Sequence, residues 1–307
     1  MSEPKNPGLI ANLRPFHLLT GALLYGLGGG IADYLGWQVE PVPYFLGQIW
    51  LIFLQLGFFF LGDYLHNPIK PGWIYYFRLL TTSQDQSDRT ADQEAENELL
   101  FPLAALFLLL MAGQVSMMYF FQQLNPISLV LMGALVGGHV ILVLPELRKH
   151  LWGFEEIVFS LLLVVLPVSL GFSLQTAAYH RFLALTTFPL YALHLSLLLG
   201  FQLIIFREDL RERRKTLLTG VGWVKGITIH NYLVIAGFFL MGAAMLFDYP
   251  AAVILPALTA LLPGAYLVWY LSRLPAGAST RLTLIAVLSL VTFGLPVYYF
   301  LYSVWVY

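Results

Sequence analysis

The sequence predicts an all-α integral membrane protein, built as a bundle of nine transmembrane helices. Its 307 residues are 59% hydrophobic and only 11% charged, with a mean hydropathy of +0.75. A soluble domain is instead roughly 45–50% apolar and about 25% charged. The apolar segments reach the ~20 residues that a helix needs to cross the hydrocarbon, and none alternates with the period of two that is typical of a membrane barrel.

Nine apolar segments supply the expected spans, in chain order. We place them at residues 16–35, 44–65, 99–121, 126–145, 155–175, 182–206, 229–247, 250–271 and 282–305. The first segment has no small-residue cleavage site behind it, so we interpret it as a retained span and not as a signal peptide.

The basic residues predict the orientation. Fifteen of the sixteen Lys and Arg residues fall before span one or after spans two, four, six and eight, and only Arg181 lies in an opposite loop. Basic loops stay in the cytoplasm, so we expect a cytoplasmic N-terminus and an external C-terminus, in a bacterial plasma membrane. A missed or false span would break this alternation, so the pattern also supports nine spans.

Composition excludes several classes of function. The chain has no cysteine, which removes disulfides, thiolate metal sites and thiol catalysis. The sequence has no stripe of basic residues of the kind that binds nucleic acid. We therefore expect membrane lipid, and no nucleic acid, as a partner of this protein. The net charge of −1 carries no message, because the distribution of charge matters more than its sum in a membrane protein.

Two spans contain a row of polar residues and end at acidic residues. Span two contains Gln48 and Gln55 and closes at Asp63, while span six contains His194 and Gln202 and runs into an acidic cluster. Lipid-facing polar groups are costly, so these side chains should point into the protein. The plainer alternative is that the Gln and His side chains only join helices by hydrogen bonds, and that the charges mark the interface.

Three motifs stand in a fixed order along the nine spans: RPFHLLTGALLYGLGGG at the start, LGDYLHN at the end of span two, and REDLRERRKTLLTGVGW after span six. Together they resemble the UbiA superfamily of intramembrane prenyltransferases. The branch that prenylates dihydroxynaphthoate on the way to menaquinone is nearest. The similarity covers nearly all of residues 1–307 as a single domain, in which the cytoplasmic loops 66–98 and 207–228 carry or flank the acidic motifs.

This resemblance implies a fold and a reaction. The fold is a helix bundle around a central cavity open to the cytoplasmic side. The reaction moves a polyprenyl group from its diphosphate to an aromatic or quinone-precursor acceptor. Acidic motifs at the ends of spans two and six hold Mg²⁺ in that family, because Mg²⁺ prefers carboxylate and phosphate oxygens and neutralises the departing diphosphate.

The resemblance also assigns roles to residues. Asp63 and Asp209 are the expected catalytic metal ligands, supported by Glu208 and Glu212. Basic side chains clamp phosphate groups well, and the expected diphosphate contacts are Arg148, Lys149, Arg211, Arg213, Arg214 and Lys215. The plainer alternative for these basic residues is that they determine topology alone.

The chain departs from the family pattern at its acidic motifs. Gly62, His66 and Lys70 stand where the first motif usually has Asn or Asp, and Ile205 stands at the first Asp of the second motif. We therefore expect one Mg²⁺ ion and not two. A non-catalytic homologue that binds an isoprenoid or quinone, or that scaffolds a membrane complex, is the main alternative. A transporter is a weaker one, because the ionisable clusters lie at one membrane face and not near the midplane.

Accessibility of single cysteines tests the orientation. Cysteines introduced at Ser83 and Ser272 should be protected from impermeant thiol reagents in intact cells, because the basic loops are predicted to be cytoplasmic. Cysteines at Gln123 and Tyr307 should be labelled. The native chain has no cysteine to confuse the result, and labelling at Ser83 without lysis would contradict the predicted orientation.

Overall fold

The computed structural model describes residues 14–66, 89–151, 153–211, 215–274 and 282–306, and this part of the chain contains helices and no strand. Eight of its helices are long and apolar enough to cross a membrane. They are α3 (Pro41–His66), α5 (Arg89–Phe120), α6 (Pro126–Val143), α8 to α9 (Glu155–Thr176), α10 (Arg181–Arg211), α12 (Trp223–Ala243), α13 to α14 (Ala251–Ser272) and α15 (Leu282–Val306).

The first expected span is also a helix. It is α2 (Arg14–Tyr34), which has 21 residues and packs against α9, α15 and α3. It is not among the eight helices that are apolar enough to count as candidate spans, because its glycines and His17 lower its mean hydropathy. The all-helical membrane fold is therefore confirmed, and the count of nine spans stays a prediction.

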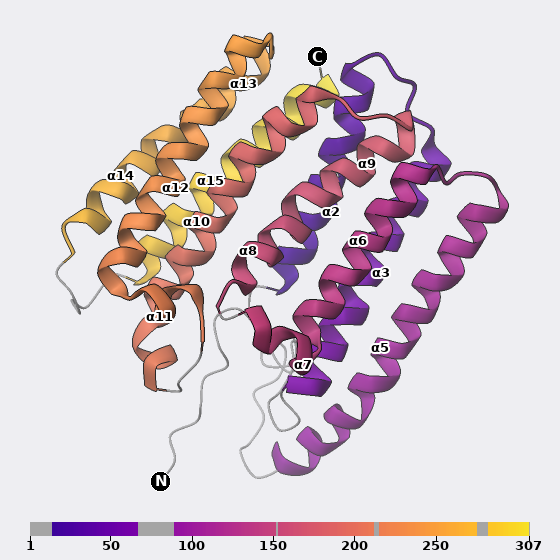
Figure 1. The fold of residues 1–307 in the computed structure, drawn as a ribbon, viewed down its shortest axis with the longest axis horizontal. Coiled ribbons are helices and arrows are strands. Elements are labelled where there is room, and N and C mark those ends of the chain that lie inside the picture. Colours follow the sequence, from indigo (N-terminus) through magenta and orange to yellow (C-terminus); the bar gives the residue numbers. More distant parts are fainter. Residues whose placement is uncertain (1–13, 67–88, 152, 212–214, 275–281, 307) are drawn as a thin grey trace.

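Successive long helices run in opposite directions (Figure 1). One end of the bundle holds the last turns of α3, α6, α10 and α14 and the first turns of α2, α5, α8, α12 and α15. We call it the basic end, because these described basic residues belong to it: Arg148, Lys149, Arg207, Arg211, Lys215, Lys225 and Arg273. Arg181 lies at the opposite end and forms an ion pair with Asp248 at 3.3 Å.

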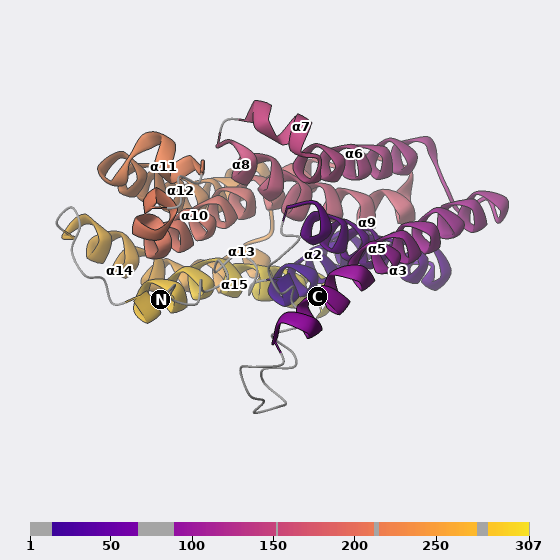
Figure 2. The ribbon, with the colours of Figure 1, turned by 90° about the horizontal axis from the view of Figure 1, so that it is seen from below.

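The interior is not shared equally among the helices. Viewed from the basic end, α3, α5 and α6 lie on one side and α11, α12 and α14 on the other, with α2 and α8 between them (Figure 2). In α10 78% of the most apolar stretch is buried inside the protein, against 17% in α5. The polar residues of α10 therefore face other helices, whereas most of α5 is left to contact lipid.

Glycines allow the closest helix contact. A Cβ at Gly28 of α2 would lie 2.0 Å from the carbonyl oxygen of Val168, and one at Gly171 of α9 would lie 2.2 Å from the carbonyl oxygen of Tyr25. Small residues let membrane helices approach to backbone contact. The glycine at position 28 of α2 therefore allows this helix to pack directly against the backbone of α9.

Several helix ends differ from the sequence predictions. α5 begins ten residues before the expected start at 99, so it takes in the end of the expected loop 66–98. α12 begins at Trp223 instead of 229. The short helices α7 (Pro145–Arg148) and α11 (Leu217–Val221) lie between the long ones. Between α8 (Glu155–Ser160) and α9 (Leu166–Thr176), residues Leu161–Val165 form a π-helical turn.

Alanine substitutions of matched glycines test the α2–α9 contact. Gly28→Ala should lower the melting temperature of the detergent-solubilised protein by several degrees, because overpacking costs about 1–3 kcal/mol or more. Gly133→Ala in α6 should leave it unchanged or raise it. Among the described residues no atom outside the backbone of α6 lies within 4 Å of the added Cβ, and Ala is the better helix former. Equal melting temperatures for the two variants would contradict the close contact.

Candidate functional site

Two buried carboxylates mark the basic end. Asp63 lies in the last turn of α3 and is 3% exposed, and Asp209 lies near the end of α10 and is 1% exposed. An ionisable side chain buried at the end of a membrane helix is expensive and is by default a candidate functional residue. The start of α8 lies between the ends of these two helices in both views (Figures 1 and 2).

The other predicted acidic and basic residues of the loop after α10 are placed only in part. Arg211 ends α10 and Lys215 precedes α11, and both side chains are exposed. The side chain of Glu208 lies outside the described residues, as do Glu212, Arg213 and Arg214. Their roles as metal ligands and diphosphate contacts stay predictions.

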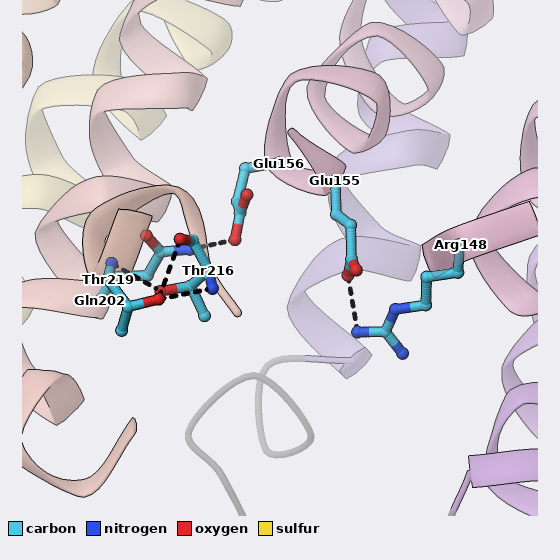
Figure 3. Close-up of polar contacts among 6 residues, drawn as sticks. All are labelled: Arg148, Glu155, Glu156, Gln202, Thr216 and Thr219. Atoms are coloured by element: carbon cyan, nitrogen blue, oxygen red, sulfur yellow. Dashed lines mark hydrogen bonds and ion pairs between the residues drawn. The ribbon is translucent and has the colours of Figure 1, made fainter. Parts of the chain in front are cut away.

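Both predicted cations of the loop after span four are paired with glutamates. Arg148 of α7 forms an ion pair of 2.6 Å with Glu155, the first residue of α8 (Figure 3). Lys149 pairs with Glu146 three residues before it. The Arg148 pair ties α7 to the start of α8, and it leaves the Arg148 side chain 40% exposed. A diphosphate contact from Arg148 would have to share the guanidinium with Glu155.

A second glutamate of α8 points into the bundle. Glu156 is 8% exposed and accepts a hydrogen bond from Nε2 of Gln202 on α10 (Figure 3). The Gln202 Oε1 atom accepts from the backbone N–H of Leu218 at 3.1 Å. One amide thus joins α8, α10 and α11, as the plainer interpretation of the polar stripe in span six proposed.

The short helix α11 is fixed at its N-terminus. The Thr216 side chain accepts from the backbone N–H of Thr219, and the Thr219 hydroxyl accepts from the N–H of Thr216 in return, which completes a capping box (Figure 3). Together with the Gln202 bond to Leu218, this cap fixes the start of α11 against α10.

Glu156 is the site residue that the sequence analysis missed. Its second carboxylate oxygen, Oε2, is buried and has no hydrogen-bond partner among the described residues. The available signal was its place in the first turn of span five, on the same membrane face as Asp63. A glutamate there is as costly as an aspartate at the end of a span.

A second polar contact between α8 and α10 lies deeper in the bundle. His194 Nδ1 and the Ser160 hydroxyl are 2.9 Å apart, and both residues are fully buried. Ser160 follows Glu156 by one helical turn, so the two share a face of α8. We call the pairs Glu156–Gln202 and Ser160–His194 the polar ladder. Because α8 and α10 run in opposite directions, it leads from the basic end into the interior.

The two buried aspartates suit Mg²⁺ only if a substrate phosphate supplies further oxygen ligands to the same ion. No group of three or more metal-binding side chains forms within the described ranges. Mg²⁺ is commonly bound by one or two carboxylates plus substrate phosphates and water, without an all-protein cage. Asp63 and Asp209 are residues of this type, and they are buried at the same end of the bundle.

Replacing Gln202 tests the lower contact of the polar ladder. Gln202→Leu leaves the Leu218 N–H and the Glu156 carboxylate buried without their partner, which costs about 1–3 kcal/mol for each group. We expect a lower melting temperature and faster hydrogen exchange at the Leu218 amide. Gln123→Leu is the control: its half-buried side chain bonds, among the described residues, only the carbonyl of Phe121 two residues before it, so it should change neither. Unchanged exchange at Leu218 in Gln202→Leu would contradict the contact.

Comparison with solved structures identifies the architecture. A UbiA homolog from Archaeoglobus fulgidus superposes with a TM-score of 0.57 at 15% identity, covering 96% of this chain and 98% of the other. The same homolog bound to GPP and Mg²⁺ gives 0.54 at 14% identity, and bound to DMAPP and Mg²⁺ it gives 0.54 at 15%. No protein-family model and no curated protein matches the sequence. The chain thus has the fold of the UbiA homologs along almost its whole length.

Proposed function

We propose that this protein is an intramembrane prenyltransferase, which transfers a polyprenyl group from its diphosphate to an aromatic or quinone-precursor acceptor with the help of Mg²⁺. A precursor of the dihydroxynaphthoate type is the acceptor that the sequence resemblance favours. In this proposal the chain is a single domain and its basic end faces the cytoplasm, so that the charged diphosphate headgroup is bound at the water-facing end of the bundle.

One observation carries the proposal. Two aspartates that the sequence resemblance assigns to metal binding, Asp63 and Asp209, come from distant helices and are both buried at the basic end of the bundle. The fold that brings them there is the fold of a homolog solved with GPP and Mg²⁺ and with DMAPP and Mg²⁺. A diphosphate held by Mg²⁺ is the ligand that such carboxylates suit.

In the proposed mechanism the protein binds the diphosphate at the basic end and the prenyl chain between apolar helices. Asp63 and Asp209 would hold Mg²⁺, with Glu208 and Glu212 in support. When bound, the ion neutralises charge on the departing diphosphate. Exposed Arg211 and Lys215 lie at the same end of the bundle and add positive charge there, together with the predicted contacts from Arg213 and Arg214.

The interior of the bundle supplies the other requirement of this chemistry. The allylic C–O bond breaks with its electron pair leaving on the diphosphate, a carbon of the acceptor ring forms the new C–C bond, and that carbon loses its proton. A prenyl cation must be kept from water during this exchange. Buried apolar side chains of α2, α9, α10 and α15 form the core beside the polar ladder, including Leu27, Phe172, Leu197, Phe201 and Phe293.

An activity assay tests the proposed function directly. Purified protein supplied with Mg²⁺, a radiolabelled polyprenyl diphosphate and a panel of aromatic acceptors should form a prenylated product. Substituting a residue that only hydrogen-bonds a metal ligand typically lowers metal affinity or activity by about 10–100-fold. Asp63→Asn and Asp209→Asn remove the proposed ligands themselves, so each should lower the rate of transfer by at least about a hundredfold.

A control substitution separates this effect from the general loss of an ion-paired acid. Asp248→Asn removes a carboxylate that pairs with Arg181 at the opposite end of the bundle, and it should leave transfer within about twofold of wild type. Full activity in both aspartate variants at the basic end would contradict the assigned metal site.

The non-catalytic alternative has one observation in its favour. Gly62, His66 and Ile205 replace carboxylates or an amide of the family motifs, which removes donors that a two-ion site needs. A wild-type protein that binds a polyprenyl diphosphate or a quinone, forms no product over the acceptor panel and keeps its binding in Asp63→Asn and Asp209→Asn would establish this alternative.

A further inference from the structure

A cluster of two histidines and two phenylalanines surrounds the upper contact of the polar ladder. The ring centroid of His17 of α2 lies 4.9 Å from Phe159 of α8 and 6.5 Å from His194. His194 lies 6.1 Å from Phe159 and 5.0 Å from Phe293 of α15. Four helices thus bring aromatic and imidazole rings to one place inside an apolar bundle.

Only one of the two ring nitrogens of His194 has a hydrogen-bond partner among the described residues. Its Nδ1 is fixed by the Ser160 hydroxyl at 2.9 Å. Its Nε2 is buried and has no hydrogen-bond partner among the described residues, and the whole side chain is 0% exposed. Leaving a buried nitrogen unbonded is costly, so an atom of this kind calls for an explanation such as a ligand.

The backbone beside this cluster is also irregular. The π-helical turn Leu161–Val165 begins directly after Ser160. Single π-helical turns are rare and occur frequently at functional sites. Ser160 is therefore the last residue of a regular helix, and its hydroxyl orients the imidazole ring across the α8–α10 contact.

We propose that this cluster binds the ring of a hydroxylated aromatic acceptor, with Nε2 of His194 bonded to a ring oxygen and with His17 and Phe293 against the ring. Phe159 is the half-buried member of the cluster, so its side chain is the one that moves to admit the ring. The proposal rests on the proposed function for the role of this ring as the prenyl acceptor.

The position of the cluster suits that role. Ser160 lies four residues above Glu156 on α8, which is about 6 Å along the helix axis. The ring would therefore lie about one helical turn farther into the membrane than Glu156 at the basic end. A diphosphate held at that end would place the reactive carbon of the prenyl chain toward the acceptor.

Paired substitutions of His194 separate ring binding from a purely structural role. Gln places an amide nitrogen near the position of Nε2, whereas Asn places one near Nδ1 and keeps the bond to Ser160. Binding of radiolabelled dihydroxynaphthoate by the full-length protein is measured by equilibrium dialysis, beside the melting temperature of each variant. We expect His194→Gln to bind within about threefold of wild type and His194→Asn to bind at least about tenfold more weakly.

His230 provides the matched control. It is also 0% exposed, its Nδ1 bonds Oδ1 of Asn231 at 3.1 Å, and its Nε2 has no hydrogen-bond partner in the described part of the chain. It lies on α12, and no ring contact joins it to the cluster among the described residues. His230→Asn and His230→Gln should therefore both leave binding unchanged.

The inference is overturned if wild type does not bind dihydroxynaphthoate, if the two His194 variants lose binding equally, or if His194→Gln loses more than His194→Asn. If His194→Asn does not fold, Phe293→Leu replaces it, and unchanged binding there also overturns the inference. Binding of methylnaphthoquinone in place of dihydroxynaphthoate would overturn the assignment to the acceptor, since it identifies the site as one for quinones.

The assay also separates this inference from the proposed function. Binding does not require turnover, so a wild type that binds the ring and transfers nothing contradicts only the proposed function. A wild type that transfers a prenyl group, with the same KM for the acceptor in both His194 variants, overturns only the ring site.

Discussion

The cost of burying polar groups in an apolar bundle governs this structure. A side chain that faces neither water nor a partner inside a membrane protein loses several kcal/mol of hydration. The polar residues of α8 and α10 offset this cost by forming hydrogen bonds with one another: Glu156 bonds Gln202, and Ser160 bonds His194. The register of these two helices, and the placement of α11 through Leu218, depend on those contacts.

Close packing of α2 complements the polar ladder. Gly28 and Gly171 allow backbone contact between α2 and α9, and His17 of the same helix α2 lies beside His194 of the ladder. Lipid tails are as apolar as leucine, so burial alone does not hold membrane helices together. Packing of small residues and interhelical hydrogen bonds do so instead, and here both devices converge on the same region.

Much of the fold was predictable because it follows from composition and charge. Hydropathy located the long helices, and the expected start of span four at residue 126 is also the first residue of α6. The start of α12 was placed six residues late because Trp223 and Lys225 belong to the charged stretch 207–228, which was expected to be a cytoplasmic loop. A lysine stem can lie along a helix end with its charge in water, so a basic residue is a poor marker of where a helix begins.

The site was less predictable than the fold. Asp63 and Asp209 could be chosen because they end polar stripes in two spans, and both are buried at the basic end. Glu156 was overlooked, and no sequence pattern shows that Gln202 bonds it, because helix rotation and partner choice come from tertiary packing. The pairing of Arg148 with Glu155 has the same origin, since the sequence gives the side of the membrane and not the partner.

Binding of Mn²⁺, which replaces Mg²⁺ and is visible by electron paramagnetic resonance, tests the central claim that the carboxylates of α3 and α10 hold a metal together with a diphosphate. We expect one Mn²⁺ ion per protein when a non-reactive prenyl thiodiphosphate is present, little binding without it, and loss of the bound signal in both Asp63→Asn and Asp209→Asn. A bound ion that persists in both variants, or no ion in the presence of the analogue, would contradict the account.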